Sequence, residues 1–255
     1  MSHTLKLMDK KMNTQSKNKS YFSLINNIQE YFNNASNSIH KARNEIKIIK
    51  YNNQEFIIKS FKIPHIINKI VYSFFRDSKA KKSYENSVKI SNFVPTPIGY
   101  IEFKKFGLIH DSYFVSEYFN YDFTIREPLL DENFKNKEKI LKLFANFSYQ
   151  LHQKNIYHLD YSPGNILIKK EENAYIFKIV DINRMQFKTL SMDDRLENFS
   201  KLWAKDEDMR IIVKEYAKII NEEEKYCIEK AIYFSQKNKN FKNFKKRLKG
   251  KKIND

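Results

Sequence analysis

The pattern of hydrophobic and polar positions divides the chain into a strand-rich part and a helix-rich part. Between residues 46 and 118, short runs of β-branched and aromatic residues alternate with polar turns, which is typical of antiparallel strands. From residue 133 onward, apolar residues recur every three or four positions, which is the spacing of amphipathic helices. The sequence therefore predicts an α+β protein with a small antiparallel sheet first and a mostly helical region after it.

The first part contains two helix predictions and two pairs of strands. A short amphipathic helix is expected over residues 21–32, where Phe22, Ile25, Ile28 and Phe32 keep helical spacing. Two β-rich runs on either side of an Asn-Asn turn predict a hairpin. A second helix is expected to begin after Ser78, a favourable N-cap, with Tyr84 and Val88 on one face. The hairpin strands are 46–51 and 56–61, the second helix covers 78–90, and the other two strands are 98–103 and 112–118.

The second part is predicted to be scaffolded by helices. Ile140, Phe144, Phe147 and Leu151 form one apolar stripe on a long helix over residues 133–154. Two short strands, 166–168 and 175–180, follow around a polar turn, and three more helices are expected over 193–203, 208–220 and 222–234. The predicted organisation is a polar, irregular N-terminus at 1–20, a small lobe at 21–120, a large lobe at 121–240 and a basic tail at 241–255.

Composition supports a folded intracellular protein. The 255 residues, 41% hydrophobic and 15% aromatic, are enough to bury a substantial core. The single cysteine, Cys227, excludes an internal disulfide framework, so a reducing cytoplasm is the expected compartment. The first residues lack the apolar segment of a signal peptide, and no run approaches the ~18 apolar residues of a spanning helix. We therefore expect a soluble or peripheral protein.

The charge balance predicts an acidic partner. Lys and Arg number 47 against 30 Asp and Glu, which gives a formal net charge of +17. Nucleic acid, an anionic membrane surface and a phosphorylated glycolipid are all candidates. Lys greatly outnumbers Arg, which favours diffuse attraction over specific reading of bases. The basic, aromatic segment Phe241–Lys252 is either a solvated tail or a device that holds the protein to an anionic membrane.

The strongest chemical signal is the run from His158 to Ile168 and the later Asp181. Asp160, Asn165 and Asp181 stand at the ends of the two short strands, so we expect them to converge at one rim of a small sheet. Phosphoryl transfer needs one carboxylate to orient the attacking hydroxyl, and an amide and a second carboxylate to hold Mg²⁺. The spacing H-x-D-x₄-N, followed by an apolar strand ending in Asp, is the pattern of the protein-kinase-like fold. His158 is interpreted as a structural residue of that loop.

The small lobe offers candidates for binding the nucleotide. Lys59 ends an apolar run as the phosphate-binding lysine of a kinase does, and Lys62 is the alternative. Glu85, the one acidic residue of its predicted helix, is the expected ion-pair partner. Glu117 and Tyr118 resemble a kinase hinge, where backbone groups bind the adenine edge. These residues predict ATP as the phosphate donor, with Mg²⁺ at Asn165 and Asp181.

Three features of a protein kinase are missing. Only four glycines occur in the chain, so no glycine-rich loop can cover the phosphates, and Lys41 or Arg43 is the candidate replacement. Asn183 stands where the metal-binding motif of kinases has glycine, and no Ala-Pro-Glu follows Asp181. Protein kinases use that later segment to dock peptides. The sequence therefore favours a small-molecule or lipid-linked hydroxyl as the acceptor.

The strings D-x-S-P-G-N-I-L at residues 160–167 and V-D-I-N-R-M at 180–185 resemble the Kdo/heptose lipopolysaccharide kinase family. The resemblance extends over roughly residues 40–205. It implies a two-lobed protein-kinase-like fold and ATP-dependent phosphorylation of an inner-core lipopolysaccharide sugar, with Kdo expected, at the inner face of the bacterial inner membrane. It also implies that Asp160 is the catalytic carboxylate, that Asn165 and Asp181 bind metal, and that Lys59 and Glu85 position the nucleotide.

Two other functions fit part of the pattern. An aminoglycoside-type phosphotransferase shares H-x-D-x₄-N, but the Ser-Pro-Gly-Asn string and the basic tail favour the lipopolysaccharide kinase. A kinase-like protein that binds anions or nucleic acid would explain the charge and the missing glycine loop. That function is less favoured, because a pure binder needs neither Asp160 nor Asp181.

Overall fold

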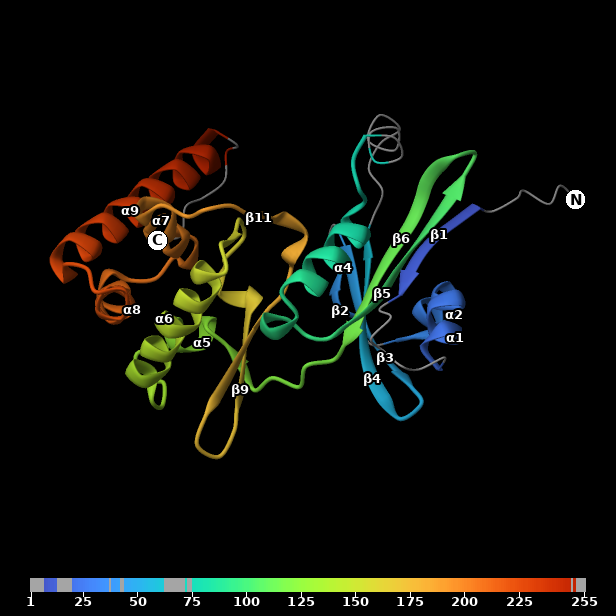
Figure 1. Cartoon of the computed structure of the whole chain (residues 1–255), viewed down its shortest axis with the longest axis horizontal. Helices are drawn as coiled ribbons and strands as arrows, with labels where there is room; N and C mark the ends of the chain where they lie inside the picture. Colours follow the sequence, from blue (N-terminus) through green and yellow to red (C-terminus); the bar gives the residue numbers. More distant parts are fainter. Residues whose placement is uncertain are drawn as a thin grey trace, which may run out of the picture. The chain divides into compact units, whose positions relative to one another are not determined.

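The computed structural model describes residues 7–12, 20–36, 38–41, 44–61, 72, 75–248 and 250. The chain splits into two compact units, Met1–Phe119 and Asn120–Asp255 (Figure 1). The predicted boundary between the lobes lay between residues 120 and 121. The first unit carries an antiparallel sheet and the second is mostly helical, so the predicted α+β class is confirmed.

The first unit is built on one six-stranded sheet with the strand order β1-β5-β6-β4-β3-β2. Every neighbouring pair of strands in it is antiparallel. The β3-β4 hairpin turns through Asn52 and Asn53, and the β5-β6 hairpin turns through Phe106 and Gly107. All four residues have positive φ, which suits the twist of paired strands. The strands are β1 Leu7–Met12, β2 Ser38–Lys41, β3 Asn44–Tyr51, β4 Gln54–Phe61, β5 Pro97–Lys105 and β6 Leu108–Glu117.

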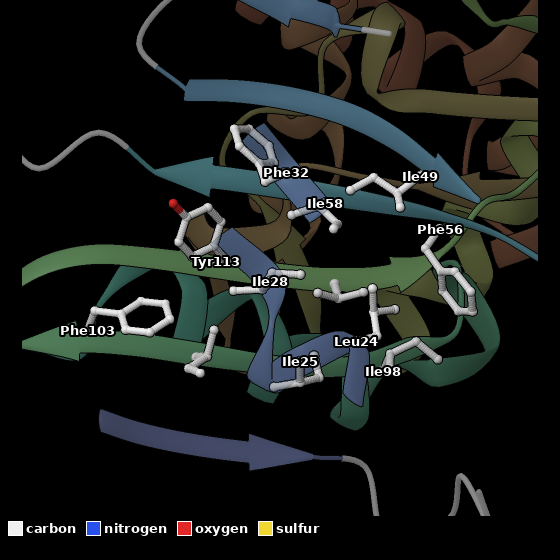
Figure 2. Close-up of a cluster of buried hydrophobic side chains, with 12 residues drawn as sticks. Leu24, Ile25, Ile28, Phe32, Ile49, Phe56, Ile58, Ile98, Phe103 and Tyr113 are labelled. Carbon is white, nitrogen blue, oxygen red and sulfur yellow. The ribbon is translucent and has the colours of Figure 1, made fainter. Parts of the chain in front are cut away.

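One face of this sheet is covered by two short helices, α1 (Ser20–Asn26) and α2 (Ile28–Asn34). Figure 2 shows their apolar side chains, among them Leu24 and Phe32, against residues of the sheet. The prediction of one continuous helix was wrong, because the helical run breaks at Asn27. Phe22, which was expected on the buried stripe, is 49% exposed.

The opposite face is covered by α4 (Lys79–Lys89). Alternate residues of a strand point to opposite faces, and Phe61 and Phe114 pack with Tyr84 of α4, whereas Ile58 and Val115 pack in the core beneath α1 and α2. The N-cap prediction is confirmed, since the Ser78 hydroxyl accepts a bond of 3.0 Å from the Lys81 N–H. Val88, predicted on the same face as Tyr84, is 46% exposed, whereas Tyr84 is buried. The 3₁₀ helix η1 (Ser91–Phe93) follows α4.

The second unit packs its helices around two small sheets, β10-β9-β7 and β11-β8. The predicted stripe of α6, from Ile140 to Leu151, is buried. The α-helices are α5 Arg126–Leu130, α6 Lys137–Gln153, α7 Met192–Phe199, α8 Asp206–Ile220 and α9 Glu224–Leu248. The strands are β7 Phe123–Thr124, β8 Ile156–His158, β9 Ile166–Lys170, β10 Tyr175–Ile179 and β11 Met185–Phe187, and the 3₁₀ helices are η2 Pro163–Asn165, η3 Ile182–Arg184 and η4 Ser200–Leu202.

Several predicted boundaries differ from the structure, three of them at the ends of long segments. Residues 7–12 form β1, although residues 1–20 were expected to be irregular, because their backbone completes the edge of the sheet beside β5. Helix α6 begins at Lys137 and not at residue 133, after Asn136 in the left-handed conformation. Helix α9 runs on to Leu248 through most of the predicted tail, because its polar side chains bond to η4 and its flank, with Asn238 on Ser200 O and Lys239 on Ala204 O.

No helix in the described ranges combines the length and the apolar character that crossing a membrane requires.

The aromatic cluster around Phe144 generates a stability prediction. Phe144 is fully buried, and its ring contacts those of Tyr161, Phe177 and Phe199 at centroid distances of 5.6, 6.4 and 6.4 Å. Replacing Phe144 by Ala should cost about 3–5 kcal/mol in the free energy of unfolding, because it removes buried surface and leaves a cavity. Urea unfolding followed by fluorescence of Trp203, the single tryptophan, measures this in the second unit.

Leu130→Ala is the matched control, since Leu130 is 74% exposed and should change the unfolding free energy by less than about 0.5 kcal/mol. Equal effects of the two substitutions would contradict the placement of the core.

Candidate active site

The loop that carries Asp160 is anchored by two short strands that the sequence did not reveal. Strand β8 ends at His158 and pairs antiparallel with β11, with His158 opposite Met185. The Leu159 N–H also donates to the Arg184 carbonyl at 3.2 Å. Strands of three residues give too little alternation to predict from sequence. They join the Asp160 loop to the segment that follows Asp181.

His158 holds the loop in shape through both ring nitrogens. The backbone N–H of Asp160 donates to Nδ1 at 3.1 Å, so Nδ1 is the unprotonated acceptor. Nε2 therefore carries the proton and donates to the Val180 carbonyl at 3.0 Å. His158 is a neutral, buried bridge between the Asp160 loop and the residue before Asp181. Its predicted structural role is confirmed.

Asn165, at the other end of the loop, also connects Asp160 with Val180. Its Nδ2 donates to the Asp160 carbonyl at 2.9 Å, and its own carbonyl accepts from the Val180 N–H at 2.9 Å. Ile166 at the start of β9 lies opposite Ile179 at the end of β10. The structure therefore brings Asp160, Asn165 and Asp181 to one edge of this sheet.

Asp181 has a left-handed backbone, with φ 58° and ψ 45°. Non-glycine residues seldom adopt this conformation, although Asp and Asn tolerate it best. Such conformations persist where the surroundings impose them, and they are concentrated at functional sites. Here β10 ends at Ile179 and η3 begins at Ile182, so Asp181 is the turning point between them.

The donor set at this edge suits Mg²⁺. Nδ2 of Asn165 is used by the Asp160 carbonyl, which leaves Oδ1 as the end of the amide that can bind a cation. Asp181 adds a carboxylate. Within the described ranges no group of three or more His, Cys, Asp and Glu side chains could hold a metal. Mg²⁺ fits two protein ligands all the same, because it usually takes its remaining oxygens from water and substrate phosphates.

A buried polar chain behind the loop was not foreseen from the sequence. Asn198 of α7 donates through Nδ2 to the His158 carbonyl at 2.9 Å, so its Oδ1 accepts from His152 Nε2 at 3.3 Å. The other nitrogen of His152 then accepts from the Tyr216 hydroxyl at 2.8 Å. Burial lowers the pKa of His152 to about 4, which keeps the ring neutral.

Tyr161 fixes the middle of the loop. Its ring is fully buried and lies 5.8 Å from that of His158, and its hydroxyl shares a hydrogen bond of 2.9 Å with Ser148 of α6. Burial raises the pKa of this phenol, so it stays protonated at all physiological pH values. The helices of this unit thus hold the loop at several points.

In the first unit, Lys59 lies on β4, two residues before Phe61. Residues two apart on a strand point to the same face, so Lys59 belongs to the face that α4 covers. Its ammonium lies 5.4 Å from the Phe61 ring. Glu85, its expected partner, lies on α4. Lys62, the alternative to Lys59, lies outside the described residues.

The predicted hinge has its amide groups already in use. The Glu117 N–H donates to the Thr96 carbonyl at 2.9 Å, and the Tyr118 N–H donates to the Glu55 carbonyl at 3.0 Å. An adenine ring could therefore bind the carbonyl groups of these residues or the next peptide group, that of Phe119. The side chain of Lys41 and all of Arg43, the candidate phosphate cover, lie outside the described residues.

The comparisons with known proteins agree with this geometry. The family described as "Lipopolysaccharide kinase (Kdo/WaaP) family" matches residues 107–222, a range that includes Asp160, Asn165 and Asp181. The resemblance to this family is confirmed within this range, whereas its predicted extension over residues 40–106 is not matched. The match begins after Lys59 and Glu85 in the chain, so it carries no information about that pair. No curated protein matches the sequence.

The comparison with solved structures found similar chains, including the following two. The structure "WaaP in complex with acyl carrier protein" is 10% identical with a TM-score of 0.58, and the match covers 87% of this chain and 96% of that one. A Rio2 kinase complex with ADP, Mg²⁺ and phosphoaspartate from Chaetomium thermophilum is 15% identical with a TM-score of 0.47, over 82% and 65% of the two chains. The chain therefore shares the fold of the WaaP structure.

The polar chain behind the loop predicts a pH dependence of stability. The pKa of His152 is about 4 in the folded protein and about 6.5 when unfolded, so the unfolded state binds the proton first as pH falls. The contribution of His152 to the free energy of unfolding is complete above pH 6.5 and is lost progressively as the pH falls towards 4. The loss amounts to about 3 kcal/mol at most.

The measurement is the free energy of unfolding in urea between pH 7 and pH 4 for the wild type and His152→Gln, which cannot titrate. The stability advantage of the wild type should shrink as the pH falls. A constant difference between the two proteins would show that His152 is not held neutral.

Proposed function

We propose that this protein is an ATP-dependent kinase that phosphorylates a sugar hydroxyl of the lipopolysaccharide inner core, with Kdo as the expected acceptor. The observation that carries the proposal is the meeting of Asp160, Asn165 and Asp181 at one sheet edge, within the range that matches the family. This is the set of groups that phosphoryl transfer requires of a protein.

Each group has a separate task. Asn165 through Oδ1 and Asp181 through its carboxylate would hold Mg²⁺, which neutralises charge on the nucleotide phosphates when bound. Asp160 would orient the sugar hydroxyl and accept its proton as the bond to phosphorus forms. Asn165 can serve both tasks at once, because its Nδ2 positions the Asp160 backbone while Oδ1 binds the metal.

The first unit would position the nucleotide. We assign Lys59 to the α- and β-phosphates and Glu85 as its partner once the nucleotide is bound, because both belong to the α4 side of the sheet. Backbone groups at Glu117 and Tyr118, acting through their carbonyls, would bind the adenine edge. The N–H groups there are already used within the unit.

The short segment between Asp181 and α7 supports a non-peptide acceptor. Only η3 and the three-residue β11 stand between Asp181 and α7, which begins at Met192. A peptide-docking segment like that of protein kinases has no room there. The support for a lipid-linked sugar is the family match, together with the net charge of +17, which attracts the phosphates and carboxylates of such a molecule.

The direct test is transfer of labelled phosphate from ATP and Mg²⁺ to Kdo-linked lipid A. Asp160→Asn should reduce turnover at least about a hundredfold, because the proton acceptor is lost while the backbone contacts remain. Asp181→Asn should abolish transfer and weaken Mg²⁺-dependent nucleotide binding, because Asn keeps the left-handed backbone but removes the charge.

Asp193→Asn is the matched control, since this exposed aspartate lies on α7 and should leave turnover unchanged. Near-normal turnover of Asp160→Asn or Asp181→Asn would remove the assigned role. Transfer to an aminoglycoside and to no core sugar would select the first alternative function. Salt-sensitive binding of RNA with no transfer to any acceptor would select the second.

We also propose that the protein works at the anionic inner face of the bacterial inner membrane, and α9 supports this. From Lys230 to Leu248 the helix carries seven Lys and Arg residues and no Asp or Glu. An exposed apolar stripe runs along the same stretch at helical spacing, made of Tyr233, Phe241, Phe244 and Leu248. Apolar groups flanked by cations are the pattern of helices that lie in an anionic membrane surface.

The test is co-sedimentation of the full chain with vesicles of phosphatidylglycerol or of phosphatidylcholine. The wild type should bind the anionic vesicles only, and less so at high salt, since charge attracts it there. The triple variant Phe241→Ser, Phe244→Ser, Leu248→Ser should lose most of this binding, whereas Phe106→Ser, at an exposed turn of the other unit, should not.

If the triple variant bound anionic vesicles as well as the wild type does, the membrane-binding surface would lie elsewhere in the protein. Binding to neither vesicle would favour a protein as the occupant of the stripe, and the WaaP structure was solved in complex with acyl carrier protein.

A further inference from the structure

An exposed arginine lies against the loop that carries Asp160. The guanidinium of Arg126 lies beside Gly164, so closely that a Cβ on Gly164 would overlap it. That Cβ would lie only 3.1 Å from the Arg126 Cζ. The Gly164 backbone has no positive φ that would by itself require glycine. The absence of a side chain at this position therefore makes room for the guanidinium.

The backbone at Arg126 is fixed to the same sheet edge as Asn165. Strand β7 pairs with β9, and the Ile125 N–H donates to the Ile166 carbonyl at 3.0 Å. The Arg126 N–H donates to the Thr124 hydroxyl at 3.2 Å. The position of this arginine is therefore set by the strand that begins directly after Asn165.

The charge of Arg126 is not neutralised by its neighbour. The Glu127 carboxylate turns back to Thr124, where it accepts from the N–H at 2.8 Å and from the hydroxyl at 2.6 Å. Among the residues that the structure describes, no carboxylate forms an ion pair with Arg126, and its side chain is exposed. An exposed guanidinium that is held against a loop, with no ion-pair partner among the described residues, is suited to binding an oxyanion.

We propose that Arg126 binds an anionic group, carboxylate or phosphate, of the acceptor sugar. This inference rests on the proposed function. Asp160 must touch the acceptor hydroxyl, and Gly164 is four residues further on, no more than about 14 Å along even an extended chain. An anionic substituent of the same sugar residue or its neighbour thus lies within reach. The planar fork of arginine matches such groups through two hydrogen bonds.

Steady-state kinetics of the full chain test this, with ATP and the acceptor varied in turn. Arg126→Ala should raise the KM for the acceptor about tenfold or more and leave the KM for ATP within about twofold. Arg126→Lys should lie between, because it keeps the charge but not the fork. Arg210→Ala, which removes an exposed arginine from α8, is the matched control and should change neither constant.

A double-mutant cycle with Gly164 adds a readout specific to the contact. Gly164→Ala should displace the guanidinium and raise the acceptor KM in the wild-type background. In the Arg126→Ala background the same change should have little further effect, because there is nothing left to displace. Thermal unfolding of each variant checks that the fold is retained.

Other outcomes overturn the inference. An unchanged acceptor KM in Arg126→Ala would do so, and a rise confined to the KM for ATP would show that Arg126 contacts the nucleotide. Additive effects in the cycle would show that the two residues act independently. If the wild type transfers phosphate and Arg126→Ala has the same KM for the acceptor, only this inference is overturned. If the wild type transfers no phosphate, the proposed function is overturned as well.

Discussion

The candidate site depends on the pair of hydrogen bonds made by the His158 ring. One nitrogen accepts from the backbone of Asp160 and the other donates to the carbonyl of Val180, so a single neutral imidazole joins the two chain segments that bear the aspartates. Protonating Nδ1 would break the bond from Asp160, and removing the ring would break both bonds. The Asn165 amide and the β8-β11 pairing reinforce the same connection.

Behind that connection, the core of the second unit is packed with aromatic side chains. Tyr161 and Phe144 pack in the core, and Asn198 passes the hydrogen-bond chain from the His158 carbonyl to His152 and on to helix α8. Buried polar groups are costly unless each finds its partner, so this chain specifies one arrangement of α6, α7 and α8 around the loop. The fold thereby fixes the backbone of the loop that carries Asp160.

The sequence predicted what short-range patterns encode. The β9-β10 hairpin, the N-cap of α4 and the buried stripe of α6 follow from period and turn chemistry, and so does the meeting of Asn165 and Asp181 at one edge. It did not predict β1, β8 or β11, because short strands are stabilised by partners far away in the sequence. The His152–Asn198 contact and the Arg126–Gly164 contact were missed for the same reason, since each joins separate elements with no local signal.

The central claim is that Asn165 and Asp181 together hold the metal of a bound nucleotide beside Asp160. A crystal structure of the protein with Mg²⁺ and a non-hydrolysable ATP analogue measures this most directly. The account predicts Mg²⁺ at about 2.1 Å from Asn165 Oδ1 and from an Asp181 carboxylate oxygen, with phosphate oxygens completing its shell. A nucleotide-bound Mg²⁺ that touches neither side chain would contradict it.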